Sequence, residues 1–218
     1  MIDLYCERTA PGLWAEPLNV LSNLAFVVAA WGISRLARDA SSPRTRVSLF
    51  IWMTLAVAAG STAFHVLATP TARLFDEGPI IAFQITFAWI YCRSVIRLGG
   101  AMTLAILAGL LAASVGARLL TVTMNGSLPY VPALALMIAF GVHHTRRAPN
   151  ARRDLLIAAV VFAVAILFRS GDAAMCQVFP VGTHFSWHML AACVLYLCAR
   201  GLLMNTIPWQ RARGPRQL

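Results

Sequence analysis

The residues in this sequence best suited to chemistry are three histidines and the polar residues near them. His184 and His188 stand four residues apart in His184-Phe185-Ser186-Trp187-His188. On a helix, positions i and i+4 share one face, so both imidazoles can bind one metal ion. For an isolated pair, the alternative is two interfacial histidines that face lipid headgroups.

A third histidine changes this balance. His65 is expected at a similar membrane depth on another helix, and polar residues in membrane helices are costly and usually functional. Three histidines with an open fourth position form a catalytic zinc arrangement. Ser61 lies one turn before His65, although its hydroxyl could instead bond its own i−4 carbonyl.

Asp76 is the candidate acid of this site. It could orient a ligand or accept the proton of the attacking water. The alternative is an acid in a loop or at the N-cap of the next helix.

The composition indicates a membrane protein that would position these residues. The chain has 218 residues, of which 59% are hydrophobic and 12% are charged, and its mean hydropathy is +0.71. A soluble domain would carry about twice that charged fraction. The apolar runs are each long enough to cross a bilayer as a helix, the natural spanning structure in lipid.

These runs predict an all-α bundle of seven transmembrane helices in a single membrane domain, 1–218. The expected parts are an outer segment 1–17, the helices within 18–204, and a cytoplasmic tail 205–218. The expected helices are 18–36, 47–68, 78–97, 101–122, 129–143, 154–171 and 184–204. The polar start, without a charged or apolar leader region, predicts no cleavable signal peptide.

The arginines predict the orientation of the bundle. The net charge is +10, and all eighteen basic residues are arginine. They lie in short loops, where topology explains them, so nucleic acid is not an expected partner. Only Arg8, Arg73, Arg118 and Arg169 fall on one side. The positive-inside rule then places the C-terminus in the cytoplasm and the N-terminus outside. The site is expected near the periplasmic face of a bacterial inner membrane.

Several motifs in order along the chain resemble the alkaline ceramidases. This family belongs to a broader group of seven-helix membrane hydrolases that includes the progestin and adiponectin receptors. The resemblance rests on Ser61-x3-His65, Phe75-Asp76-Glu77-x-Pro79, His184-x3-His188, Tyr5-Cys6-Glu7, Glu16-x2-Asn19-x2-Ser22-Asn23, and Phe168 to Cys176 with Asp172 inside it.

The resemblance implies a zinc-dependent amidase that cleaves the N-acyl amide of ceramide, or of a related N-acyl lipid, into a fatty acid and a free amine. It implies that His65, His184 and His188 bind zinc. Asp76 would activate the water, and Ser61 would help to hold the site or the oxyanion. Asp172 would lie just outside the metal ligands. The resemblance also pairs Cys6 with Cys176, which the topology expects on the outer side, where oxidation is possible.

The N-terminal segment departs from the family pattern. The family binds calcium there through several oxygens, with an acid just before an aromatic-Cys-Glu step. Here Leu4 holds that position, and Arg8 and Thr9 follow where acid or amide oxygens are expected. Asp3, Glu7 and Glu16 could still form a hard-cation site. The alternative is a solvated acidic segment.

The rival function is a non-enzymatic receptor-like binder or a metal transporter. A transporter needs ionisable residues that continue across the midplane. The sequence offers none between the outer polar residues and the inner arginines. A receptor would be expected to carry recognition or coupling domains, and these loops are short. The sequence leaves the oligomeric state and the true lipid undetermined.

Overall fold

The structure is a computed structural model that describes residues 2–36, 43–120, 124–147 and 153–204. All regular secondary structure in these ranges is helical. The helices are α1 (Pro17–Ser22), α2 (Leu24–Leu36), α3 (Arg44–Leu67), α4 (Pro70–Tyr91) with a π-helical end (Cys92–Ile96), α5 (Gly100–Arg118), α6 (Val131–Arg147), α7 (Asp154–Met175) and α8 (His184–Leu203). Two short 3₁₀ turns, Met124–Gly126 and Leu128–Tyr130, precede α6.

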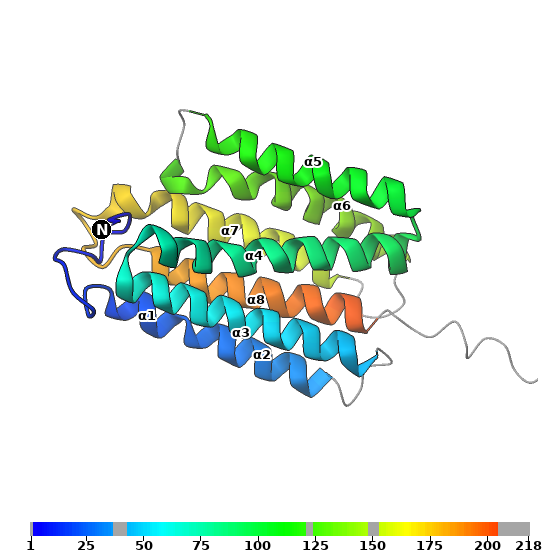
Figure 1. The fold of residues 1–218 in the computed structure, drawn as a ribbon, viewed down its shortest axis with the longest axis horizontal. Helices are drawn as coiled ribbons and strands as arrows, with labels where there is room; N and C mark the ends of the chain where they lie inside the picture. Colours follow the sequence, from blue (N-terminus) through cyan, green and yellow to red (C-terminus); the bar gives the residue numbers. More distant parts are fainter. Residues whose placement is uncertain (1, 37–42, 121–123, 148–152, 205–218) are drawn as a thin grey trace, which may run out of the picture.

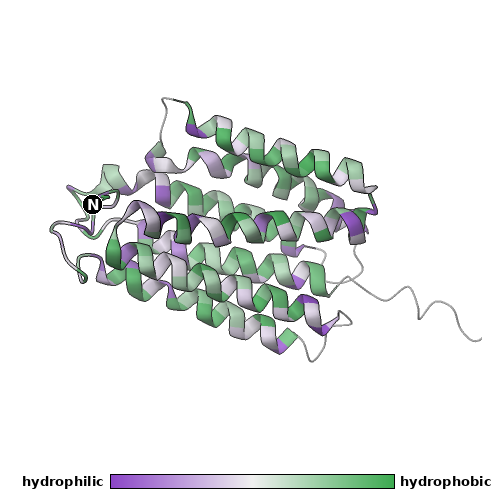
Figure 2. Ribbon diagram, in the orientation of Figure 1, coloured by the Kyte–Doolittle hydropathy of each residue, from purple (hydrophilic) through white to green (hydrophobic). Residues whose placement is uncertain are grey.

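Seven segments in the described part of the chain are long and apolar enough to cross a membrane, and the first combines α1 with α2. They run alongside one another in one bundle (Figure 1). Hydrophobic residues dominate the helix middles, and hydrophilic residues gather toward the helix ends (Figure 2). The prediction of an all-α seven-helix membrane protein is confirmed. The predicted tail 205–218 lies outside the described residues.

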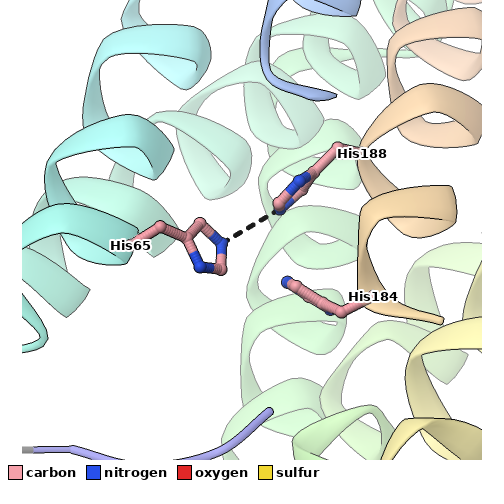
Figure 3. A group of neighbouring side chains, drawn as sticks. All are labelled: His65, His184 and His188. Atoms are coloured by element: carbon pink, nitrogen blue, oxygen red, sulfur yellow. Dashed lines mark hydrogen bonds between the residues drawn. The ribbon is translucent and has the colours of Figure 1, made fainter. Parts of the chain in front are cut away.

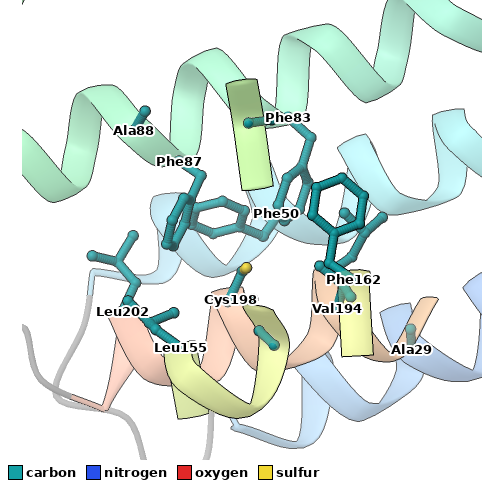
Figure 4. Packing of buried hydrophobic residues seen from close by; sticks show 14 of the residues in the cluster. Ala29, Phe50, Phe83, Phe87, Ala88, Leu155, Phe162, Val194, Cys198 and Leu202 are labelled. Atoms are coloured by element: carbon teal, nitrogen blue, oxygen red, sulfur yellow. The ribbon is translucent and has the colours of Figure 1, made fainter. Parts of the chain in front are cut away.

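The bundle interior is a continuous apolar core. Phe50 of α3 packs against Phe83 of α4 with ring centroids 5.3 Å apart. Figure 4 shows these rings close to Phe87, Phe162, and the Cys198 side chain of α8. This packing fixes α3, α4, α7 and α8 against one another, and these four helices carry most of the candidate site.

Helix α4 begins eight residues earlier than the expected start at 78. Its N-cap is Thr69, whose hydroxyl accepts a hydrogen bond from the Ala72 amide at 3.1 Å. Pro70 follows at the first helical position, where its missing amide costs nothing. The helix therefore extends through Asp76, which had been expected in a loop or at the helix start.

The Gly78-Pro79 step, at which the sequence predicted the start of a helix, lies inside α4. A proline at 79 cannot donate to the carbonyl of Phe75, four residues earlier. That carbonyl faces Gly60 of α3 so closely that a Cβ at Gly60 would clash with it. The glycine lets the two backbones meet, and this brings the next residues, Ser61 and Asp76, together.

The polar candidates gather at one end of the bundle. His65 lies in the last turn of α3, and His184 is the first residue of α8. Both lie at the end of the bundle where the chain begins (Figure 1). Asp172 lies within α7, which continues to Met175 rather than ending at 171. The orientation of this end relative to a membrane stays a prediction.

Candidate metal centre

The three predicted histidine ligands meet in the folded chain. His65 comes from α3, while His184 and His188 come from adjacent turns of α8 (Figure 3). All three are buried, and each offers one ligand atom within 4.8 Å of the other two. They are the only group of this kind among the residues that the structure describes. The arrangement could hold a metal ion.

The spacing of the nitrogen atoms fits zinc. The Nε2 atoms of His65 and His188 lie 3.1 Å apart. Two nitrogens on a tetrahedral zinc lie about 3.3 Å apart when each Zn–N bond is about 2.0–2.1 Å. In addition, the buried Nδ1 of His184 has no hydrogen-bond partner. A buried polar atom without a partner is uncommon.

Glu16 sets the chemical form of His65. Its Oε2 lies 2.5 Å from His65 Nδ1 and also accepts a hydrogen bond from Asn19 at 3.0 Å. Burial raises the pKa of Glu16, but hydrogen bonds from His65, Asn19 and Arg8 outweigh this and lower the pKa below its usual range. The ionised carboxylate accepts the Nδ1 proton of His65, which leaves Nε2 free to bind a metal. Sequence analysis had assigned Glu16 only to a calcium site.

Ser22 plays the same part for His188. The Ser22 hydroxyl donates to the Asn19 carbonyl at 2.9 Å. Its oxygen is therefore an acceptor for the Nδ1–H of His188, 2.7 Å away. This tautomer presents Nε2 of His188 toward His65. The polar residues of Glu16-x2-Asn19-x2-Ser22 recur every three residues, so the motif was visible in the sequence, but its target was not.

His184 is held mainly through its backbone and its ring face. Asp172 Oδ1 accepts hydrogen bonds from the backbone amides of Thr183 and His184, at 2.6 and 2.9 Å. Asp172 thus satisfies two of the free amides at the start of α8. The Tyr5 ring stacks on the His184 imidazole with centroids 3.5 Å apart. Asp172 is buried, and its carboxylate contacts are to backbone amides rather than to an imidazole; its expected place just outside the metal ligands stays a prediction.

The N-terminal segment is fastened to the C-terminal end of α7. The structure contains the Cys6–Cys176 disulfide that the resemblance implied, across a sequence separation of 170. The Cys6 amide also donates to Asp172 Oδ2 at 3.0 Å. These bonds fix the segment whose next side chains reach the histidines.

Ser61 and Asp76 complete the predicted set. Ser61 is buried, and its hydroxyl lies 3.4 Å from His188 Nε2 and hydrogen-bonds Asp76. Asp76 is 8% exposed in the second turn of α4, and Thr69 is the N-cap of that helix. Asp76 therefore does not cap this helix. Its position beside Ser61 places a carboxyl group next to the histidine cluster.

Arg169 is a buried cation that sequence reasoning counted only for topology. Its Nη1 donates to the Tyr5 hydroxyl at 2.6 Å, and its Nε has no hydrogen-bond partner. The guanidinium lies 5.3–5.5 Å from the ring centroids of Tyr5, Tyr130 and Trp187. Burial raises the pKa of the Tyr5 hydroxyl, so it stays protonated. An arginine within an otherwise apolar helix is the signal that could have identified it.

The acids proposed for calcium do not meet in one cluster of metal-ligating atoms within the described ranges. Both Glu7 oxygens accept backbone amides of α1, from Leu18 at 2.5 Å and Asn19 at 2.8 Å. Asp3 is exposed. Glu16 is held by the contacts given above and by Arg8. Calcium usually takes 6–8 oxygen ligands, and the Glu7 and Glu16 oxygens here already accept hydrogen bonds.

The sequence matches a known protein family along nearly its whole length. The sequence model of the Ceramidase family matches residues 5–212, nearly the whole chain. The matched range contains the three histidines, Ser61, Asp76 and both disulfide cysteines. A comparison with curated proteins finds no match.

Proposed function

Because this chain belongs to the ceramidase family, we propose that it is a zinc-dependent amidase of the membrane. Family membership supports a ceramide-hydrolysing enzyme that acts on an amide bond. The proposal adds the metal, the residues and a wider substrate class of N-acyl lipids. The observation that carries it is the buried trio of His65, His184 and His188, with ligand atoms within 4.8 Å of one another.

These three imidazoles would hold zinc, and Glu16 and Ser22 would keep two of them in the binding tautomer. Bound zinc polarises an amide carbonyl and lowers the pKa of water, so that a nucleophile exists near neutral pH. The buried surroundings exclude competing water and strengthen each charge interaction. Ionised Glu16 would offset part of the added positive charge.

Asp76 would accept the proton from the attacking water and pass it to the amine that leaves. Its burial and its hydrogen bond with Ser61 support this role, because both fix the carboxyl beside the histidines. General bases act through this kind of fixed proximity. Ser61, also 3.4 Å from His188 Nε2, would hold Asp76 and line the oxyanion position.

An apolar cavity lies in the interior of the bundle and supports a lipid substrate. Its walls come from helices α2 to α8 and include Phe83, Phe87, Phe162, Trp187 and Leu195. Phe26, another residue of the wall, has its ring centroid 6.3 Å from that of His188, so the cavity approaches the histidine cluster. An acyl chain in this cavity would place its amide toward the three histidines.

The test is release of fatty acid from a panel of N-acyl lipids, including ceramide, by purified protein loaded with zinc. His65→Ala, His184→Ala and His188→Ala should each lose zinc and hydrolysis. His143→Ala, at the other end of the bundle, should keep both. A wild-type protein that binds zinc yet releases no fatty acid from any lipid would instead favour the receptor-like or transport alternative.

The proposal places the site at the periplasmic face of a bacterial inner membrane, on the positive-inside argument. No nucleic acid is involved. A calcium ion held by Asp3, Glu7 and Glu16 stays a prediction from the family resemblance. Arg8, which is bonded to Glu16, occupies part of that place.

A further inference from the structure

Arg8 is a buried cation beside the proposed metal centre. It is 5% exposed although it belongs to the N-terminal segment, outside the membrane-spanning helices. Its Nε donates to Glu16 Oε1 at 2.5 Å, and its Nη2 donates to the backbone carbonyl of His65 at 2.7 Å. The Arg8 guanidinium therefore connects two groups that hold His65. One is Glu16, which bonds the His65 ring, and the other is the backbone carbonyl of His65 itself.

The position of Arg8 is fixed from both sides along the chain. Its amide donates to the Tyr5 carbonyl at 3.2 Å, which closes a turn over Cys6 and Glu7. Cys6 is anchored to α7 by the disulfide, and Glu7 caps α1. Cys6, Glu7 and Arg8 therefore contact three different parts of the protein: Cys6 contacts α7, Glu7 contacts α1, and Arg8 contacts Glu16.

A cation is needed at this place whatever its identity. Glu16 is buried, and an unpaired buried carboxylate is strongly unfavourable. The acids Asp3, Glu7 and Glu16 suggested from the sequence that a hard cation such as calcium could meet this need. Here the Glu16 oxygen that could face such an ion is bonded to Arg8, and the other is bonded to His65 and Asn19. A divalent ion at the same oxygen would be repelled by the guanidinium.

We infer that Arg8 is a built-in cation that takes the place of a bound calcium ion and positions His65 through Glu16. The inference rests on the proposed zinc centre. Arginine suits this role because it stays charged at every working pH and has donors in a rigid planar fork. Its charge is covalently attached, so the centre would assemble without any second metal. Arg8 is a positioning residue and contacts no reacting atom.

The first experiment uses the unaltered protein. Zinc affinity and lipid hydrolysis are measured in calcium-free buffer and again with calcium raised to about 10⁻³ M, where extracellular calcium modules bind. Both should be unchanged, and radioactive calcium should not be retained by the zinc-loaded protein. A zinc affinity or a hydrolysis rate that rises with calcium would overturn the inference.

The second experiment removes the charge while keeping the apolar stem. Arg8→Met should weaken zinc binding by roughly 10–100-fold, as for other residues that hold a metal ligand. Arg8→Lys should fall between Arg8→Met and wild type, because a single ammonium group replaces the fork. The matched control is Arg200→Met, which breaks the pair of Arg200 with buried Asp154 (2.7 Å) on the far side of the bundle. It should leave zinc affinity within about twofold of wild type.

The outcomes separate this inference from the proposed function. A wild-type protein that binds no zinc at all refutes the metal centre itself. A wild-type protein that binds zinc, together with a folded Arg8→Met protein of unchanged affinity, refutes only the role of Arg8. If Arg8→Met does not fold, the calcium titration of the wild type still decides the matter.

Discussion

Replacement of Asp76 by asparagine separates an enzyme from a binding protein most directly. The change keeps the shape of the side chain, and the amide can still hydrogen-bond Ser61. It removes only the capacity to accept a proton from water. Asp76 lies in the second turn of α4 and Thr69 caps that helix, so no helix cap is lost. The fold and most of the zinc should remain.

The expected loss in turnover follows from the role of the carboxyl. A positioned general base contributes typically about 10²–10⁴-fold to rate, which is about 2.7–5.4 kcal/mol of barrier. Burial and the bond with Ser61 hold this carboxyl in place, which argues for the upper half of that range. Fatty acid release is measured at saturating N-acyl lipid, with zinc content measured on the same samples.

Asp154→Asn is the matched control. Asp154 is also buried in a helix, but it pairs with Arg200 away from the histidines. The same chemical change there should leave turnover per folded, zinc-loaded molecule near wild type. If Asp76→Asn keeps its zinc and turns over at a near wild-type rate, Asp76 is not the proton acceptor.

Three further predictions follow from the N-terminal segment and the topology. Peptide mapping without reductant should recover Cys6 linked to Cys176. Because the bond spans 170 residues of sequence, Cys6→Ser should lower the free energy of unfolding by up to about 5 kcal/mol. Two alkylatable thiols in the native protein would contradict the disulfide. The lowered pKa of Glu16 means that its stabilisation is complete above the unfolded value of about 4.3 and is lost as pH falls through the lower folded pKa. Glu16→Gln should therefore reduce the stability of the zinc-free protein at neutral pH and flatten its loss in acid, and an unchanged acid profile would argue against the pairing. A reporter fused after Leu218 should read cytoplasmic, and a periplasmic reading would put the histidines on the opposite face.

The sequence alone determined the architecture and singled out the three histidines that meet in the fold. Apolar runs of about 20 residues must become helices in lipid, because only a helix satisfies its own backbone there. The spacing of His184 and His188 fixes their common face through helix geometry. Both inferences depend on neighbours in the chain, and the structure agrees with each of them. His65, the third predicted ligand, was inferred from its expected depth in the membrane. That depth follows from its position along the helix and the rise per residue.

The supporting contacts were decided only by tertiary structure. Glu16 reaches His65 across 49 residues, and Ser22 reaches His188 across 166. Such pairings depend on how α1, α3 and α8 pack, which no local pattern encodes. The start of α4 was predicted eight residues too late, because a Gly-Pro step usually interrupts a helix. Within this bundle Gly60 packs closely against the Phe75 carbonyl that Pro79 leaves without its usual amide partner, and the same close approach puts Asp76 beside Ser61.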